Sequence, residues 1–202
     1  MRPSTLLFAA TVAAAPSALR RRQDDSATTS LNVTESLWDG QCYYPKPTEH
    51  FDLHQYLGRW YQVAGSAFGQ TAGCTCIFAE YTLNENGTVN VLNGCQAAGR
   101  DVRIQGIASP ADEAYGEAGV LRVQFPPQPP PTECAGPNYI VQAYEPRWAI
   151  VQASNFSTLF LLSRDQAPGD ELIDEWLDRA GKLGTNLTDV AKVSQEGCLF
   201  TG

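Results

Sequence analysis

The sequence predicts an all-β fold: an eight-stranded up-and-down antiparallel β-barrel with one C-terminal α-helix packed on its outside. Eight short segments between residues 59 and 164 have the composition or the alternation of strands, and turn-forming residues separate them. One segment with helical periodicity, residues 168–180, follows the last of them. Eight consecutive strands followed by a single helix are typical of a closed barrel, which the helix covers with its apolar stripe.

The N-terminal segment has the features of a leader that is removed. Arg2, an apolar centre at residues 6–10 and three alanines that follow are typical of a secretory signal peptide. Three arginines at 20–22 favour a further cut by a processing protease. For a secreted, extracellular protein we therefore expect a signal peptide and propeptide at 1–22, a flexible leader at 23–41 and the barrel domain at 42–202.

The chain is acidic, with a formal net charge of −8. Removal of residues 1–22 would take away four arginines and no acidic residue, which makes the product more acidic still. Nucleic acids and anionic lipid surfaces recruit Lys and Arg, so we expect neither as a partner. No stretch approaches the ~20 apolar residues of a membrane-spanning helix, so we expect no membrane span. The sequence identifies no protein partner.

Cysteines and glycosylation sequons also fit a secreted protein. An even number of cysteines in an oxidising compartment predicts three disulfides among Cys42, Cys74, Cys76, Cys95, Cys134 and Cys198. Because His50 and His54 are the only histidines, we expect no Cys/His metal site and no cofactor. Acceptor sequons predict N-glycosylation at Asn32, Asn86, Asn155 and Asn186.

The first four strands follow from alternation and turn chemistry. Residues 52–57 form one helical turn with Asp52 as its N-cap, and the first strand follows at 59–66. Asn86-Gly87 is a strong hairpin signal, because both residues tolerate positive φ. It joins strands at 76–83 and 88–93. The fourth strand, 101–108, contains Gly106, which we expect at a bend or bulge.

The fifth strand, 121–125, alternates cleanly, with Leu121, Val123 and Phe125 inward and Arg122 and Gln124 outward. A proline-rich loop at 126–131 ends it. The remaining strands are expected at 139–144, 148–153 and 157–164, the last of which places Phe160, Leu162 and Arg164 inside. The helix at 168–180 carries an apolar stripe made of Leu172, Ile173, Trp176, Leu177 and Ala180.

Gly58-Arg59-Trp60 resembles the Gly-x-Trp signature of the lipocalins. The resemblance extends from Cys42 to Cys198 and is greatest to the apolipoprotein D and bacterial-lipocalin branch. It is carried by residues 51–61, 76–83, 85–87, 91–93, 104–106, 121–125 and 161–164. The chain departs from the branch twice: Gln142-Ala143-Tyr144 stands where the family has Thr-Asp-Tyr, and the strand at 148–153 has no cysteine.

This resemblance implies a carrier that holds a small hydrophobic molecule, such as a sterol, fatty acid, terpenoid or pigment, in the barrel cavity. It places Gly58, Trp60 and Arg164 at the closed end of the barrel, where the guanidinium stacks on the indole. It also makes Tyr81 and Asn93 the polar residues of the cavity, whereas an arginine of the branch is Ala97 here. The expected ligand-binding residues are Ile77, Tyr81, Asn93, Leu121, Val123, Phe125, Phe160 and Leu162.

By the same resemblance, Cys76 pairs with Cys198 and joins the C-terminal tail to the barrel. Counting residues back from the hairpin brings Cys74 near Cys95, within reach of the ~5.5–6 Å Cα spacing of a disulfide. Cys42 is then left for Cys134, in the loop beside the strand that receives the N-terminal cysteine in the branch. The sequence leaves the pairing of these last four cysteines open.

Three alternatives compete with the carrier. A lipocalin-fold enzyme of the isomerase or de-epoxidase type needs a free thiol, such as Cys74, or a poised acid in the cavity. A haem or metal protein would use His50 and His54, which precede the first strand. A protein-binding module would use the Gly-rich and Pro-rich loops at the rim.

Overall fold

The computed structural model describes residues 34–66, 71–127 and 133–200. The chain divides into two units, 1–31 and 32–202, and every described residue lies in the second unit. The expected signal peptide and propeptide, the leader as far as residue 33 and the sequon at Asn32 lie outside the described residues. So do parts of the Gly-rich and Pro-rich loops, 67–70 and 128–132.

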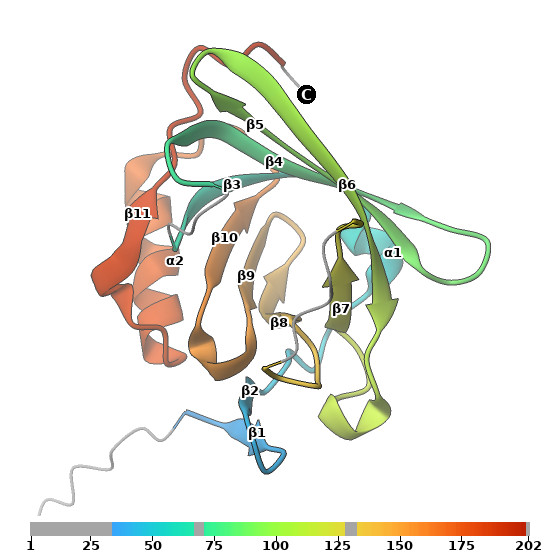
Figure 1. Cartoon of the computed structure of the whole chain (residues 1–202). Coiled ribbons are helices and arrows are strands. Elements are labelled where there is room, and N and C mark those ends of the chain that lie inside the picture. Colours follow the sequence, from blue (N-terminus) through green and yellow to red (C-terminus); the bar gives the residue numbers. More distant parts are fainter. Residues whose placement is uncertain (1–33, 67–70, 128–132, 201–202) are drawn as a thin grey trace, which may run out of the picture. The chain divides into compact units, whose positions relative to one another are not determined.

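Eight antiparallel strands form the barrel, and each pairs with the next along the chain (Figure 1). The last strand also pairs with the first, at Phe160 opposite Gly65, and this pairing closes the barrel. The eight-stranded up-and-down barrel predicted from the sequence is therefore confirmed. Its strands are β3 (Gly58–Ser66), β4 (Cys74–Leu83), β5 (Val89–Ala97), β6 (Arg100–Pro110), β7 (Val120–Gln124), β8 (Tyr139–Glu145), β9 (Trp148–Gln152) and β10 (Leu159–Ser163).

Strand alternation separates two apolar clusters. One lines the inside of the barrel and includes Trp60, Val91 and Leu162. The other lies on the outside and includes Tyr61, Ile150 and Leu161, together with residues of the C-terminal helix. Adjacent residues of one strand, such as Leu161 and Leu162, thus belong to opposite faces of the sheet.

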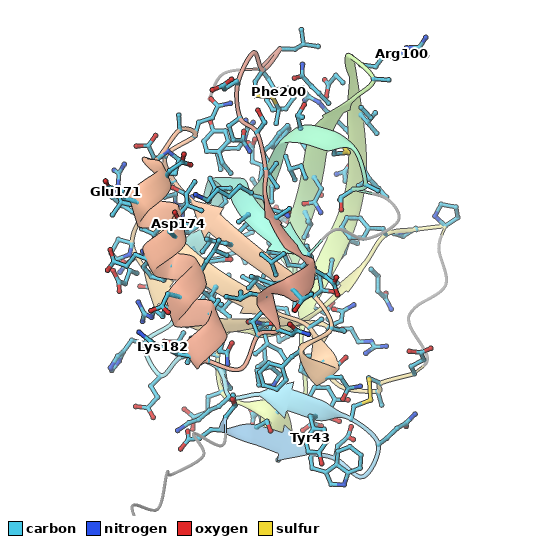
Figure 2. All side chains as sticks on the ribbon, turned by 90° about the vertical axis from the view of Figure 1, so that its left-hand side faces the viewer. Tyr43, Arg100, Glu171, Asp174, Lys182 and Phe200 are labelled. Carbon is cyan, nitrogen blue, oxygen red and sulfur yellow. A yellow bond between two sulfur atoms is a disulfide. The ribbon has the colours of Figure 1, made fainter. Side chains whose placement is uncertain are left out.

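The C-terminal helix α2 (Asp170–Lys182) covers the outer cluster with Ile173, Trp176 and Ala180. The rings of Trp176 and Trp148 stack with their centroids 5.4 Å apart. The expected stripe was wrong in one residue, Leu172, which is 47% exposed because it lies beside the charged side of the helix. Glu171, Asp174 and Lys182, labelled in Figure 2, are exposed residues of that helix.

A short helix, α1 (Leu53–Tyr56), precedes the first barrel strand. The side chain of Asp52 accepts hydrogen bonds from the backbone N–H groups of His54 and Gln55, so its predicted role as N-cap is confirmed. The end of the barrel that holds α1, Trp60 and Arg164 is called the closed end. The open end is the opposite one, where β4 and β6 begin.

Two short strands lie within residues 34–46, partly in the segment that the sequence assigned to a flexible leader. They are β1 (Ser36–Trp38) and β2 (Tyr43–Pro45), which pair as a hairpin. Between them, the Asp39 carboxylate accepts hydrogen bonds from Gln41 N, Cys42 N, Tyr44 Oη and Tyr115 Oη. Cys42 and Tyr44 pack on the barrel against Val120 and Ile140.

A third short strand, β11 (Val190–Lys192), lies beside β3 on the same side of the barrel as α2 (Figure 1). Strand β4 pairs with β3 only over Gly58–Tyr61, and its register against β5 shifts between Thr75 and Phe78. The edge of β3 beyond that point would be unpaired, and β11 occupies it at Ala64–Ser66. Gln195 Nε2 fastens the following tail by donating to the carbonyls of Gln62 and Ile77.

Disulfides join Cys42 to Cys134, Cys74 to Cys95 and Cys76 to Cys198. These are the three pairs that the sequence analysis named. The first attaches the N-terminal hairpin, the second links β4 to β5, and the third attaches the C-terminal tail. None of the helices described for this chain is long and apolar enough to cross a membrane.

Three short 3-10 helices complete the described chain: η1 (Glu113–Tyr115), η2 (Ser154–Phe156) and η3 (Leu187–Asp189). In the segment Gln142-Ala143-Tyr144, Ala143 stands in the place of the family's aspartate, and the neighbouring Gln142 donates from Nε2 to the carbonyl of Leu183, just after α2. Of the bend or bulge expected at Gly106, the bulge was wrong: the pairing of β5 with β6 continues unbroken through this residue. Gly106 instead leaves space for the ring of Phe125, since a Cβ would lie 2.5 Å from its Cδ1 atom.

Candidate functional site

The barrel encloses a cavity of about 820 Å³. Its wall comes from the inward positions of the strands, where alternation places mostly aliphatic and aromatic side chains. All eight residues that the sequence assigned to ligand binding border it: Ile77, Tyr81, Asn93, Leu121, Val123, Phe125, Phe160 and Leu162. Their contact with a ligand stays a prediction. Bordering residues that the sequence analysis did not name include Leu53, Tyr56, Val89, Val91, Ile104 and Tyr139.

Arg122 and Gln124, the two residues of β7 that were expected to point outward, differ in their contacts. Arg122 donates from Nη1 to the carbonyls of Cys134, Ala135 and Gly136, which holds the loop before β8 against the barrel. Gln124, expected to point outward, is exposed but also borders the cavity. Arg122 therefore has a structural role, although it points away from the interior.

Trp60 is fully buried at the closed end of the barrel, where its ring forms the floor of the cavity. Its Nε1 donates to the carbonyl of Tyr56 at 2.8 Å, and the two rings lie 5.0 Å apart. The guanidinium of Arg164 lies over the indole, 3.8 Å from its centroid. Gly58 has φ +89°, which a side chain would strain, and it lies beside Arg164 Nη1. The structure thus brings together the three residues that the sequence placed at the closed end.

Three tyrosine hydroxyls meet just above this floor. Tyr139 Oη lies 2.6 Å from Tyr56 Oη and 2.9 Å from Tyr81 Oη, so the three form a chain with Tyr139 in the middle. Burial raises the pKa of Tyr81 to about 12 and the pKa values of Tyr56 and Tyr139 well above their ordinary value. All three are therefore neutral hydrogen-bonding groups at physiological pH.

Sequence reasoning named Tyr81 but missed the other two tyrosines. A signal for Tyr139 was present, because it alternates with Val141 on the strand predicted at 139–144. Tyr56 is the last residue of α1, four residues before Trp60, but nothing local shows that its hydroxyl reaches β8. The chain of hydroxyls depends on contacts among α1, β4 and β8, which only the folded structure brings together.

Asn93 lies farther from the floor, opposite Ala79 on β4 and Ile104 on β6. Its Oδ1 atom is buried and accepts no hydrogen bond from the described residues. Buried polar atoms are normally paired, so this oxygen is suited to receive a donor from a guest in the cavity. The charged residues that border the cavity, Arg103 and Glu133, are both exposed.

The groups required by the alternative functions are arranged differently. Cys74, the candidate nucleophile of an enzyme, is bonded to Cys95, and none of the six cysteines is free. His50 and His54 are exposed and do not border the cavity. Within residues 34–66, 71–127 and 133–200, no group of three or more His, Cys, Asp and Glu side chains could hold a metal ion.

The family model described as "Lipocalin-like domain" matches residues 51–195. Apolipoprotein D of Mus musculus is 30% identical over 167 residues, which cover 79% of this chain and 85% of that protein. Temperature-induced lipocalin-1 of Arabidopsis thaliana is 32% identical over 150 residues, 71% of this chain and 79% of that protein. The alignment with apolipoprotein D of Bos taurus, at 39% identity, covers only 44% of the bovine protein.

Among solved structures, insecticyanin from the tobacco hornworm Manduca sexta superposes with a TM-score of 0.55 at 20% identity. The superposition covers 74% of this chain and 83% of insecticyanin. At this identity the similarity concerns the fold, and it agrees with the strand order and the closure found here.

Proposed function

Because the chain belongs to the lipocalin family, close to apolipoprotein D, we propose that it is a secreted carrier of a small hydrophobic molecule. The observation that carries this proposal is the cavity of about 820 Å³ inside the barrel, bordered mainly by apolar side chains. A volume of this size is in the range of pockets that bind small molecules. Transfer of the guest from water stabilises the complex by about 25 cal/mol per Å² of apolar surface buried.

Polar groups in the cavity orient the guest. Asn93 offers a buried carbonyl oxygen that has no partner among the described residues, and Tyr81 offers a neutral hydroxyl at the floor. Ala97 on β5 carries no charge, so this strand provides no cation for an acidic head group. The aliphatic residues Val91, Val123 and Leu162 surround the body of the ligand.

An isomerase is the less favoured function. The nucleophile that such an activity would draw on is Cys74, and its sulfur is bonded to Cys95. The tyrosines of the cavity keep their protons, because burial raises their pKa. The groups that border the cavity therefore favour binding over chemistry.

Secretion and glycosylation belong to the same proposal. Three disulfides fit an oxidising compartment. The sequons at Asn86, Asn155 and Asn186 are all exposed and so accessible to the glycosylation machinery. Protein from a eukaryotic secretory host should lose mass on treatment with a peptide N-glycosidase, and retention of mass at all three sites would contradict the glycosylation.

The uncharged fluorescent probe N-phenylnaphthylamine tests the carrier function. Wild-type protein should bind it in the cavity and enhance its fluorescence. Leu162→Asp should abolish this binding, because the new carboxylate would be buried at a position that is 4% exposed. Ile107→Asp is the matched control: Ile107 also lies on a barrel strand but is 46% exposed, so binding should be unchanged.

A second variant covers the case in which Leu162→Asp does not fold. Val91→Phe fills part of the cavity without adding charge and should weaken probe binding while preserving the circular dichroism spectrum. Absence of binding by the wild-type protein, or equal binding by all the variants, would refute the proposal. Native mass spectrometry of the secreted protein, followed by extraction of the bound molecule, would then identify the ligand.

A further inference from the structure

We propose that the tyrosine chain Tyr56–Tyr139–Tyr81 is a fixed hydrogen-bond donor that selects ligands with an uncharged acceptor oxygen. The ligand would carry a ketone or hydroxyl oxygen, and would bind with this oxygen toward the closed end. This inference rests on the proposed carrier function and specifies the chemical class of the ligand.

A count of protons supports the donor. Each phenol has one proton to donate, and the three phenols are joined by two hydrogen bonds, at 2.6 Å and 2.9 Å. Two protons lie in these bonds, whichever way the bonds run, and one proton is left over. Among the described residues no other group accepts a hydrogen bond from these hydroxyls. The unused proton therefore points to an acceptor that enters the cavity.

Because the hydroxyls are buried, the unused proton makes them a selective hydrogen-bond donor. Tyr56, Tyr81 and Tyr139 are 2%, 7% and 9% exposed, and all three border the cavity. Their rings hold one another in place: Tyr56 and Tyr81 stack at 5.6 Å, and Tyr81 meets Tyr139 edge-on at 6.2 Å. A donor that is fixed and desolvated discriminates strongly between ligands that can accept its hydrogen bond and ligands that cannot.

The position of the chain sets the orientation of the ligand. Tyr81 is paired with Gly58 at the first residue of β3, and Tyr56 packs directly on Trp60. The hydroxyls therefore lie at the floor, and the apolar residues Ile77, Ile104 and Phe160 border the cavity nearer the open end. A ligand that bonds to the tyrosines must enter with its oxygen first and leave its apolar end nearer the opening.

Charge distinguishes a neutral oxygen from a carboxylate. A buried carboxylate needs a cation, and the cation nearest the floor, Arg164, lies against Trp60 and donates to three backbone carbonyls. Arg103, which borders the cavity, is exposed and paired with Asp101 at 2.9 Å. The neutral phenols can donate one hydrogen bond to a ligand but cannot neutralise a carboxylate, so ketones and alcohols should bind in preference to fatty acids.

Displacement of N-phenylnaphthylamine by methyl octyl ketone and by decanoate tests the inference. On wild-type protein the ketone should compete better than decanoate of the same chain length. The triple variant Tyr56→Phe/Tyr81→Phe/Tyr139→Phe keeps the rings and removes the hydroxyls. We expect its affinity for the ketone, relative to its affinity for the probe, to fall about five- to tenfold, as for the loss of one hydrogen bond. Tyr61→Phe, at a buried tyrosine outside the barrel, is the matched control and should change neither affinity.

The outcomes separate this inference from the carrier function. Equal affinity of wild type and triple variant for the ketone, or preference for decanoate, would overturn the inference while probe binding upholds the carrier. Failure of the wild-type protein to bind either the probe or the ketone would refute the carrier function itself. If the triple variant does not fold, the infrared carbonyl stretch of the ketone bound to wild type decides. A shift to lower frequency than in hexane supports the hydrogen bond, and an unshifted band overturns it.

Discussion

Arg164 and Trp60 close one end of the barrel by stacking, with the guanidinium carbon 3.8 Å from the centroid of the indole. The same guanidinium donates to the backbone carbonyls of Arg59, Gln55 and Leu57. One side chain at the end of β10 therefore holds the segment that leads into β3. Arg164 is half-buried, so the cation–π contact contributes roughly 0.5–2 kcal/mol, and the hydrogen bonds to carbonyls add to it. The floor is thus a structural device that supports the tyrosines above it.

Replacement of the indole should be strongly destabilising. Trp60→Ala removes a side chain that is fully buried, and we expect a loss of about 3–5 kcal/mol in the free energy of unfolding. Trp38→Ala is the control, because Trp38 is 51% exposed and contacts mainly Tyr43. It should cost at most about 1.5 kcal/mol. Urea denaturation measures both values, and similar losses in the two variants would contradict the role of Trp60.

The barrel itself was predictable because side chains that point inward and outward alternate along its strands, and this alternation is visible within a few residues of sequence. Alternation in β7 places Leu121 and Val123 at the cavity and Arg122 outside, as expected from the sequence. The Asn86-Gly87 turn likewise joins β4 to β5 as expected, with Leu83 opposite Val89. Apolar and polar residues that alternate along a strand specify which face of the sheet is buried, so the strands and their inward residues can be predicted from the sequence alone.

The short strands β1, β2 and β11 were not predictable, because residues far away in the sequence hold them in place. Residues 190–192 have no strand pattern, and they pair with β3 only because β4 leaves that edge free. The hairpin of β1 and β2 is held by Asp39 and by the bond from Cys42 to Cys134. The tyrosine chain was missed for the same reason, since its members meet from three elements that are far apart in sequence.

Acid should loosen the N-terminal hairpin through Asp39. Hydrogen bonds from the backbone N–H groups of Cys42 and Gln41 lower the pKa of Asp39 to about 2. Because this folded pKa lies below the unfolded value of about 4, the carboxylate stabilises the protein above about pH 4. That contribution is lost as the pH falls through about 2. Asp39→Asn should therefore be less stable than wild type at neutral pH.

The difference between wild type and Asp39→Asn should shrink between about pH 4 and about pH 2. Thermal unfolding at a series of pH values measures it. Asp112→Asn is a useful comparison, because Asp112 accepts from the backbone of Ala114 only. A constant difference for Asp39→Asn over the whole range would show that its carboxylate does not hold the hairpin.

Alkaline pH should destabilise the barrel through the buried phenols. The pKa of Tyr81 is raised to about 12, and burial raises the pKa values of Tyr56 and Tyr139 well above the ordinary value near 10. The stability that neutral tyrosines provide is complete below about pH 10 and is lost as the pH rises toward about 12. In a titration of phenolate absorbance, the native protein should lag behind the protein in urea.

Tyr81→Phe removes one of the phenols that titrate late and should reduce this lag while leaving the absorbance that develops earlier unchanged. The comparison isolates the cavity from the exposed tyrosines, such as Tyr43 (Figure 2). Coincidence of the native and unfolded titration curves would mean that the three hydroxyls are open to water.

Gly106 and Phe125 should be coupled, because the glycine leaves the space that the ring occupies. A Cβ at residue 106 would lie 2.5 Å from Phe125 Cδ1 and would also meet the carbonyl of Gln124. Gly106→Ala should therefore destabilise by about 1–3 kcal/mol and weaken binding of N-phenylnaphthylamine, since Phe125 borders the cavity. In the double variant Gly106→Ala/Phe125→Ala the ring can no longer clash, so the loss of stability should be smaller than the sum of the two single losses. Urea denaturation of all four proteins completes the cycle, and strict additivity would show that the ring does not depend on the missing side chain.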